Sequence, residues 1–307
     1  MRDKQTSLPE AIGALVRDGD SVVLGACLEP NIPFAATFEI IRQGKTGLRM
    51  IAPISDGSTD MLIGAGCVGG IIGAWVGSVS AGLGHNYRRA AEHGVPNKLE
   101  IEDHSNFTLG MALLAGAYGM PYAPTRSILG SDIVKSNPKL HLAENPLGED
   151  GEAVVLVPPL KPDVAILCVQ RSDIAGNAYH WGNAGVAKEA AIAAERVILL
   201  ADEIVPTEVI TSDPGRVLFP GLHVSAVCHV EAGCHPAPMT GRWQRDHAFF
   251  DEYHQRSRAA DGFDAWAKEW IHDLPDHEAY RAKLGQRLKD LRIRGEALSA
   301  PANWAAA

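Results

Sequence analysis

Apolar positions in the first half of the chain alternate between helical spacing and short runs that are apolar throughout. Ser7 and Glu10 have the spacing of a capping box, and the apolar residues that follow them recur at helical spacing. The run Val22–Leu24 is typical of a strand buried on both faces. Pro33 opens a second predicted helix, and Leu48–Ile51 is the next predicted strand. This order predicts a parallel sheet covered by helices.

The second half of the chain repeats this pattern. An alanine-rich stretch, residues 187–195, predicts a helix between further strands. The further predicted strands are 154–157, 164–169, 197–200 and 224–230.

Aromatic and charged residues dominate after about residue 242. The apolar residues between Phe263 and Ile271 fall on one face of a predicted helix, and residues 277–288 predict a last one. We therefore expect residues 1–292 to form one α/β domain, an open and mostly parallel sheet flanked by helices, with a helical C-terminal extension. Residues 293–307 are expected to be a disordered tail.

Charge and cysteine content narrow the classes of function. The 307-residue chain carries a net charge of −9, which argues against a nucleic-acid partner because such proteins concentrate positive charge. Five cysteines without a short-range framework predict reduced thiols in a cytoplasmic protein. The first residues contain no apolar core of a secretory signal, so none is expected.

The segment 61–84 has no formal charge and is long enough to span a bilayer. Its eight glycines favour buried strands and turns instead, so we expect no membrane helix.

Two short motifs suggest other chemistries, and a third motif is absent. Gly64–Gly69 reads GxGxxG, but the residues after it are too rich in glycine and β-branched side chains to begin a nucleotide-binding helix. Cys228–His229 and Cys234–His235 match no common zinc spacing, so no metal site is predicted. No GxSxG elbow supports a serine hydrolase.

Glycines that follow predicted strands are more informative. Gly25 follows Val22–Leu24, and Gly130 and Ser131 follow another extended segment. In open α/β sheets ligands bind at the carboxyl ends of strands, where glycine lets the backbone approach them. Ordinary turn chemistry explains the same residues without a ligand.

A series of segments spread over the chain resembles one enzyme family. The segments are Asp18–Gly25 with Pro33, Phe38–Gly44, Asp60–Gly64, Pro158–Ala165, Asp173–Asn177, Ala267–Trp270 and Asp273–His277. In this order they resemble the A (alpha) chain of family I coenzyme A transferases, particularly the glutaconate type. The signature departs from the family at Ala26, Cys27 and Asn31, where the family has glycine, phenylalanine and glycine. These departures concern the shape of one loop.

The resemblance implies an active site completed by a second polypeptide. The family's nucleophilic glutamate lies in a Ser-Glu-Asn-Gly type motif of the B subunit, and the nearest string here is Ala143–Pro146. Proline replaces its glycine, so Glu144 is not expected to be the nucleophile, and no catalytic residue is predicted in this chain. The implied reaction is covalent ping-pong transfer of coenzyme A (CoA) between acids, with oxyanions that need preorganised donors.

The resemblance also suggests roles for individual residues in binding substrate or CoA, or in stabilising an oxyanion. Gly25, Gly130 and Ser131 are expected to line the pocket, and Ser78 to hydrogen-bond the carboxylate or hydroxyl of the acyl group. Arg126 pairs either with an acidic substrate or with Asp132. Gln170, like Asn177, either contacts substrate or stabilises a loop. These choices stay open at this stage.

The expected partners are the B subunit, an acyl-CoA and a carboxylic acid, with no nucleic acid, membrane or tightly bound cofactor. The main alternative is the A subunit of a steroid-ring CoA-thioester hydrolase of the same fold, which cleaves a carbon–carbon bond without the glutamate of the family's B chain. Two weaker alternatives are a NAD-binding oxidoreductase, based on Gly64–Gly69, and a non-catalytic binding protein.

Overall fold

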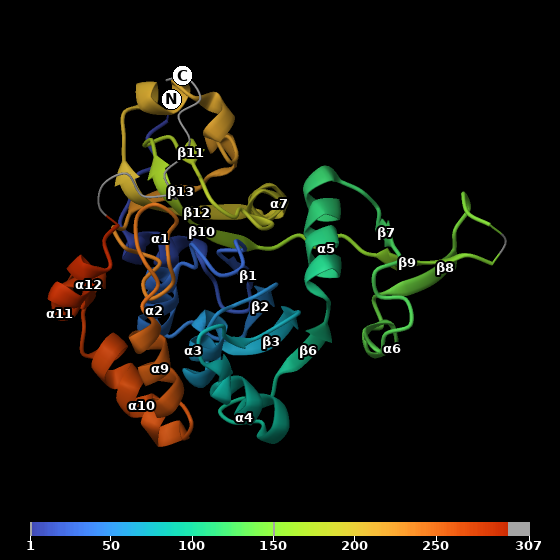
Figure 1. Cartoon of the computed structure of the whole chain (residues 1–307), viewed down its shortest axis with the longest axis horizontal. Helices are drawn as coiled ribbons and strands as arrows, with labels where there is room; N and C mark the ends of the chain where they lie inside the picture. The colour runs from blue at the N-terminus through green and yellow to red at the C-terminus, as the bar shows by residue number, and fades with distance from the viewer. Residues whose placement is uncertain (1, 150, 294–307) are drawn as a thin grey trace.

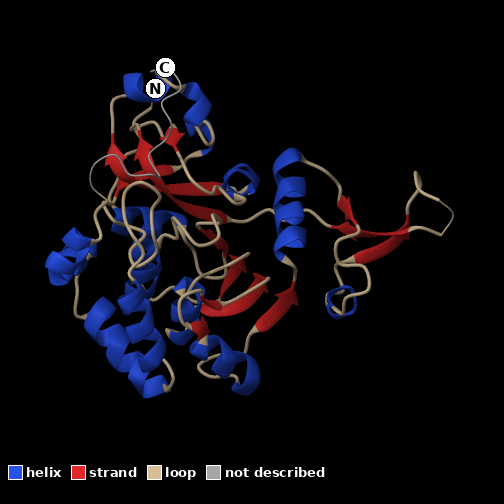
Figure 2. Ribbon diagram, in the orientation of Figure 1, coloured by secondary structure: helices blue, strands red, loops and turns tan. Residues whose placement is uncertain are grey.

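The computed structural model describes residues 2–149 and 151–293. The tail expected at 293–307 lies, apart from Ile293, outside the described residues. The chain folds into three layers, with a central sheet between two sets of helices (Figures 1 and 2). This confirms the α/β class with a mostly parallel sheet and a helical C-terminal region.

The central sheet places β1 in its middle. Its strands run in the order β13-β12-β10-β1-β2-β3-β6, all neighbours on this path being parallel. The chain moves outward from β1 through β2 and β3 to β6, and then returns to β10 on the other side of β1. This reversal creates a switch point between β1 and β10, where open α/β folds bind ligands. The bounds are β1 Ser21–Leu24, β2 Leu48–Ala52, β3 Val68–Gly73, β6 Glu100–Asp103, β10 Val164–Ser172, β12 Arg196–Ile204 and β13 Ala226–His229, with β11 Ala178–Tyr179 antiparallel to β10.

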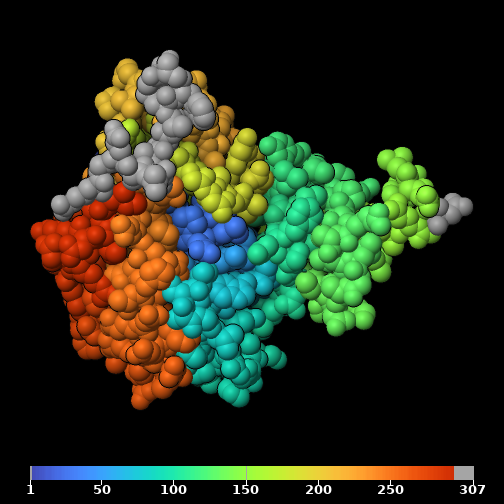
Figure 3. Space-filling view, viewed as in Figure 1, coloured from blue at the N-terminus to red at the C-terminus, as the bar shows by residue number. Residues whose placement is uncertain are grey.

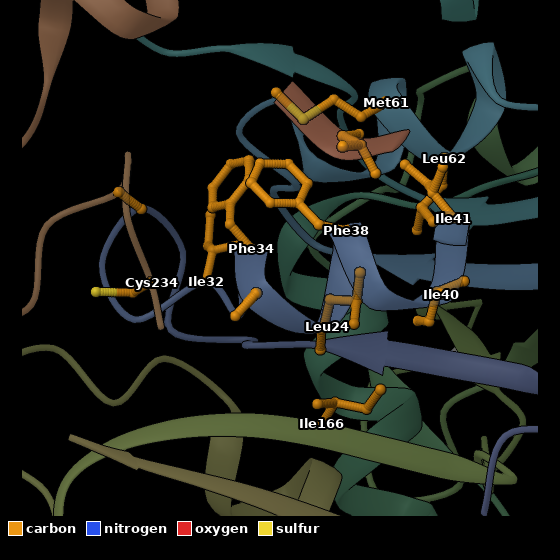
Figure 4. Packing of buried hydrophobic residues seen from close by; sticks show 14 of the residues in the cluster. Leu24, Ile32, Phe34, Phe38, Ile40, Ile41, Met61, Leu62, Ile166 and Cys234 are labelled. Atoms are coloured by element: carbon orange, nitrogen blue, oxygen red, sulfur yellow. The ribbon is translucent and has the colours of Figure 1, made fainter. Parts of the chain in front are cut away.

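Helices cover both faces of this sheet, because its strands are apolar on both faces. Val22 and Leu24 pack into the larger core, whereas Val23 packs into the core on the opposite face. Figure 4 shows part of the larger core. Its helices are α1 Leu8–Leu15, α2 Phe34–Arg42, α3 Ser58–Gly64, α4 His85–His93, α9 His247–Arg256, α10 Ala260–Ala267, α11 His277–Leu284 and α12 Gln286–Asp290. The other face is covered by α5 Asn106–Tyr118 and α7 Ala187–Ala193.

Local sequence signals set several element boundaries. The capping box at Ser7 is present at the start of α1, with Glu10 reaching back to the Ser7 amide. The predicted last helix is wrong in one respect: Gly285, with φ +55°, divides it into α11 and α12. The helix predicted through Ile271 continues from α10 as a π-helical turn, Lys268–His272. The remaining short elements are α8 Thr207–Thr211 and two 3₁₀ turns, Pro214–Arg216 and Gly221–His223.

Residues 121–149 and 151–157 form a projection that we call the arm, visible beyond α5 in Figures 1 and 3. It contains an antiparallel sheet in the order β7-β9-β8 and the short helix α6. The bounds are β7 Ala123–Thr125, α6 Ile133–Ser136, β8 His141–Glu144 and β9 Ala153–Val157. The prediction that 154–157 continues the parallel pattern is therefore wrong, because a run of apolar residues does not determine which strand it pairs with.

The glycine-rich segment 61–84 forms the end of α3, the strand β3 and a hairpin of β4 Gly77–Ser78 and β5 Gly82–Leu83. Within the described ranges, no helix is long and apolar enough to cross a membrane.

Candidate functional site

Backbone strain marks one edge of the central sheet. Five non-glycine residues in the described part of the chain have positive φ, and all of them lie in loops that follow the carboxyl ends of β1, β2 or β13. They are Ala26, Leu28, Asn31, Asp56 and Ala232. Such residues cost about 1–3 kcal/mol each and cluster at functional sites, and this edge is also where open α/β folds bind ligands. The carboxyl edge of the sheet is therefore the candidate site.

Gly25 shapes the loop after β1. Its φ is +77°, and a Cβ atom there would lie 3.1 Å from the Ile32 Cα atom, so the turn requires glycine. Its amide donates to the Ile166 carbonyl at 2.9 Å, within the sheet. Gly25 is thus placed at the switch point, but its N–H is already bound, so its contribution to a pocket is shape rather than a donor.

The loops after β1 and β10 are hydrogen-bonded to each other. The Val186 amide donates to the Ala26 carbonyl at 2.9 Å. His180 Nε2 lies 3.2 Å from the Asn183 carbonyl, so this nitrogen carries the proton and Nδ1 accepts from Asn31 Nδ2, also at 3.2 Å. Burial lowers the pKa of His180, which favours this neutral form. The Asn31 Oδ1 atom is buried and has no hydrogen-bond partner among the described residues.

Gln170 lies near the carboxyl end of β10 and is completely buried. Its amide Nε2 donates to the carbonyls of Trp181 at 2.9 Å and Thr240 at 3.2 Å. Asn177 donates to Asp173 at 2.9 Å. Both amides therefore stabilise loops, which is one of the two roles that the sequence left open.

Ser78 lies in the β4–β5 hairpin, which follows β3 at the same carboxyl edge. The side chain is buried, with 4% of the residue exposed. Its Oγ accepts from the Ala81 amide at 3.3 Å. Among residues 2–149 and 151–293, no group accepts a hydrogen bond from this hydroxyl. Ser78 can therefore still donate a hydrogen bond to a ligand.

A buried ion pair supports this hairpin, and sequence reasoning missed it. Asp56 follows β2, and Arg245 precedes α9; the Oδ2 and Nη1 atoms lie 2.6 Å apart. Arg245 also donates through Nε to Ser80 Oγ at 2.6 Å. The two residues are 189 positions apart, and no local sequence pattern predicts a contact over that distance. Only the folded structure shows it.

The remaining predicted residues lie in the arm. Arg126 is largely exposed and pairs with Glu152 at 2.5 Å, rather than with Asp132. Gly130 adopts φ +80° with open space around it, and Ser131 Oγ donates to the Ile128 carbonyl at 2.9 Å. The extended segment before Gly130 is β7, which belongs to the antiparallel sheet of the arm and not to the central sheet. The structure does not bring these residues to the carboxyl edge of the central sheet.

Asp202 and Cys27, two potential nucleophiles near the carboxyl edge, are engaged or protonated. The carboxylate of Asp202 accepts from Trp243 Nε1 at 2.6 Å and from the Ala232 amide at 2.8 Å. Burial raises the pKa of the Cys27 thiol to about 12, so it is not a thiolate near neutral pH. Glu144 is exposed in β8 of the arm, away from this edge.

The structure does not support the motifs that suggested nucleotide or metal binding. Gly64–Gly69 spans the end of α3 and the start of β3, which reverses the strand-to-helix order of a dinucleotide fingerprint. The described residues contain no group of three or more His, Cys, Asp or Glu side chains that could hold a metal ion.

Known proteins share both the sequence and the fold. The family model for coenzyme A transferase matches residues 5–229. The chain therefore belongs to the coenzyme A transferase family.

Two relatives are A subunits of such enzymes. The chain is 39% identical to the A subunit of 3-oxoadipate CoA-transferase of Pseudomonas knackmussii, over 91% of this chain and 98% of that protein. It is 33% identical to the A subunit of glutaconate CoA-transferase of Acidaminococcus fermentans, over 94% and 95% of the two chains. The crystal structure of the latter enzyme matches with a TM-score of 0.89 at 34% identity, covering 95% of this chain and 96% of that one. The resemblance predicted from the sequence is confirmed.

Proposed function

We propose that this chain is the A subunit of a two-subunit acyl-CoA:carboxylate CoA-transferase. The observation that carries this proposal is the 39% identity to the corresponding chain of a transferase over almost the full length of both proteins. The proposed role of this chain is to shape the acyl pocket and supply contacts to the oxyanion, while the B subunit supplies the glutamate nucleophile.

The state of three buried groups at the carboxyl edge is consistent with a nucleophile from another polypeptide. Asp56 and Asp202 at the carboxyl edge are held by cationic or N–H donors, which stabilise the carboxylate and reduce its reactivity. The Cys27 thiol is buried and its pKa is raised. These groups are poorly suited to attack a thioester.

In the proposed reaction, CoA is transferred to the enzyme in two steps. A glutamate carboxylate that the B subunit supplies attacks the thioester carbonyl, the CoA thiolate leaves, and a mixed anhydride forms. The thiolate then attacks the glutamyl carbonyl, which releases the first acid and leaves a glutamyl-CoA thioester. A second acid reverses both steps. Each attack creates an oxyanion, and Ser78 is proposed to orient the acyl chain while this occurs.

The test is reconstitution with a candidate B-type subunit. We expect CoA transfer between acyl-CoA and a carboxylic acid only when both chains are mixed, and mass spectrometry after incubation with acyl-CoA should find a CoA adduct on the B subunit. Full activity of this chain alone would contradict the proposal. Carbon–carbon bond hydrolysis of a ring CoA thioester without an adduct would favour the hydrolase instead.

A further inference from the structure

The ion pair between Asp56 and Arg245 combines one hydrogen bond with a second close contact, whose two atoms make no hydrogen bond of their own among the described residues. Both side chains are buried, with 0% and 10% of their surface exposed. The Oδ1 atom of Asp56 accepts from Nη2 at 2.9 Å, and Oδ2 lies 2.6 Å from Nη1. The guanidinium also stacks over the ring of Phe250, with Cζ 4.2 Å from its centroid. Burying two charges carries a desolvation cost, so such a pair is weak evidence for added stability and is better explained by a role in positioning.

This pair holds the two residues that directly follow Ser78. The Val79 amide donates to Asp56 Oδ1 at 2.8 Å. Ser80 Oγ accepts from Arg245 Nε at 2.6 Å. Its own hydrogen is therefore free to donate to His247 Nδ1, which lies 3.0 Å away. The hairpin is thus fixed from two segments that are remote in sequence.

Asp56 adopts strained backbone geometry to make these contacts. Its φ of 36° lies in the left-handed region, and Gly57 follows with φ +92°. Strain of this kind persists only where surrounding contacts over-determine it. Here those contacts are the ion pair with Arg245 and the hydrogen bond from Val79.

We infer that Asp56, Arg245 and Ser80 are positioning residues that hold Ser78 for acids with a second polar group, an inference that rests on the proposed function. Ser78 is buried and has a hydroxyl hydrogen without an acceptor in the described chain. A second carboxylate on the acyl group accepts that hydrogen, whereas an unsubstituted acyl chain offers no acceptor. The cluster therefore sets the preference for dicarboxylic over monocarboxylic acids.

The expected effect is a change in discrimination rather than a uniform loss of activity. A hydrogen bond to a charged group gives discrimination on the order of 10- to 100-fold. Displacing Ser78 should reduce the ratio of kcat/KM for a dicarboxylate to kcat/KM for its analogue in which hydrogen replaces the second carboxyl group. Damage to the fold lowers both values together and leaves their ratio unchanged.

The experiment compares variants of this chain in the complex reconstituted with its B-type partner. Ser80→Ala removes the hydrogen bond from Arg245, and Asp56→Asn removes the ion pair. Ser78→Ala removes the proposed ligand contact itself, so it gives the largest expected loss of discrimination between dicarboxylic and monocarboxylic acids. The acids are glutaconate and crotonate, which differ by one carboxyl group. We expect the kcat/KM ratio to fall about threefold or more in Ser80→Ala, and to approach the Ser78→Ala value in Asp56→Asn.

Asp20 and Arg196 provide a matched control pair. Their side chains are each 10% exposed, with Oδ1 and Nη2 3.1 Å apart, but they lie at the amino edge of the same sheet. Asp20→Asn should lower thermal stability and leave the kcat/KM ratio unchanged.

The outcomes separate the inference from the proposed function. An active wild-type complex whose ratio is the same in Ser80→Ala and Asp56→Asn overturns the inference. A wild-type complex that transfers CoA to no acid overturns the proposed function and the substrate part of the inference. Hydrogen exchange then decides the positioning part: amides at 77–83 should exchange faster in Ser80→Ala than in wild type, and equal exchange overturns it.

Discussion

The central sheet and the arm hold their side chains in different ways. Around the sheet, Phe38 is buried and its ring contacts those of Phe34, Trp266 and Tyr280, from both ends of the chain. The arm has a small core of four buried residues, which pack with Ala112 of α5; Val155 and Val157 are completely buried. Its predicted site residues are exposed or bound to neighbours in sequence, as Ser131 is to Ile128. The comparison indicates that precise placement of a site needs contacts from remote segments.

The largest expected effect comes from the core beside the sheet. Phe38→Ala removes a ring that is 1% exposed and makes edge contacts with three other aromatic rings. We expect the free energy of unfolding to fall by about 3–5 kcal/mol. Urea unfolding followed by far-UV circular dichroism measures this, with Phe38→Leu as a milder control. A loss below about 1 kcal/mol would show that this core tolerates cavities.

The arm should respond more locally. Val155→Ala removes two buried methyl groups from its small core, which should cost about 2 kcal/mol. Because few other residues support the arm, we expect faster hydrogen exchange in β7, β8 and β9 with little change in the central sheet. Equal acceleration in the central sheet would mean that both regions unfold as one cooperative unit.

A half-buried histidine should make the main body sensitive to acid. His277 Nε2 donates to the Glu231 carbonyl at 2.8 Å, and burial lowers the pKa of His277 to about 4. The unfolded chain, with a pKa near 6.5, binds the proton first as pH falls, so this contribution to stability is present above about pH 6.5 and is lost toward pH 4. The slope from this group reaches at most about 1.4 kcal/mol per pH unit.

The measurement is urea unfolding between about pH 4.5 and 7.5. His277→Gln removes the titrating group and should flatten the dependence, whereas substitution of the exposed His93 by glutamine should leave it unchanged. An identical slope in His277→Gln and wild type would rule out this assignment.

The smallest effect is expected at the surface of the arm. Arg126 has a side chain that is 69% exposed, and its ion pair with Glu152 is open to solvent. Arg126→Gln should change the free energy of unfolding by less than about 1 kcal/mol. In the reconstituted complex, an increase in KM for acidic substrates alone would place Arg126 in the acyl site; unchanged kinetics would leave it as a surface residue of the arm.

Much of the fold could be predicted because its signals are local. The apolar run Val22–Leu24 predicts a doubly buried strand, and Ser7 with Glu10 predicts the start of α1, since both depend on residues a few positions apart. Gly285 shows the limit of prediction from local patterns. A glycine inside a helical pattern can either be tolerated or end the helix, and the sequence alone does not decide which.

The sequence by itself determined the α/β class, the family resemblance and the position of Gly25 at the end of a strand. Tertiary structure alone decided that 154–157 pairs in an antiparallel arm, that the Gly25 amide is used within the sheet, and that Arg245 reaches Asp56. The physical reason is that hydrophobic periodicity records which face of an element is buried. Strand pairing and buried ion pairs depend on partners far away in sequence, and a local pattern does not predict those partners.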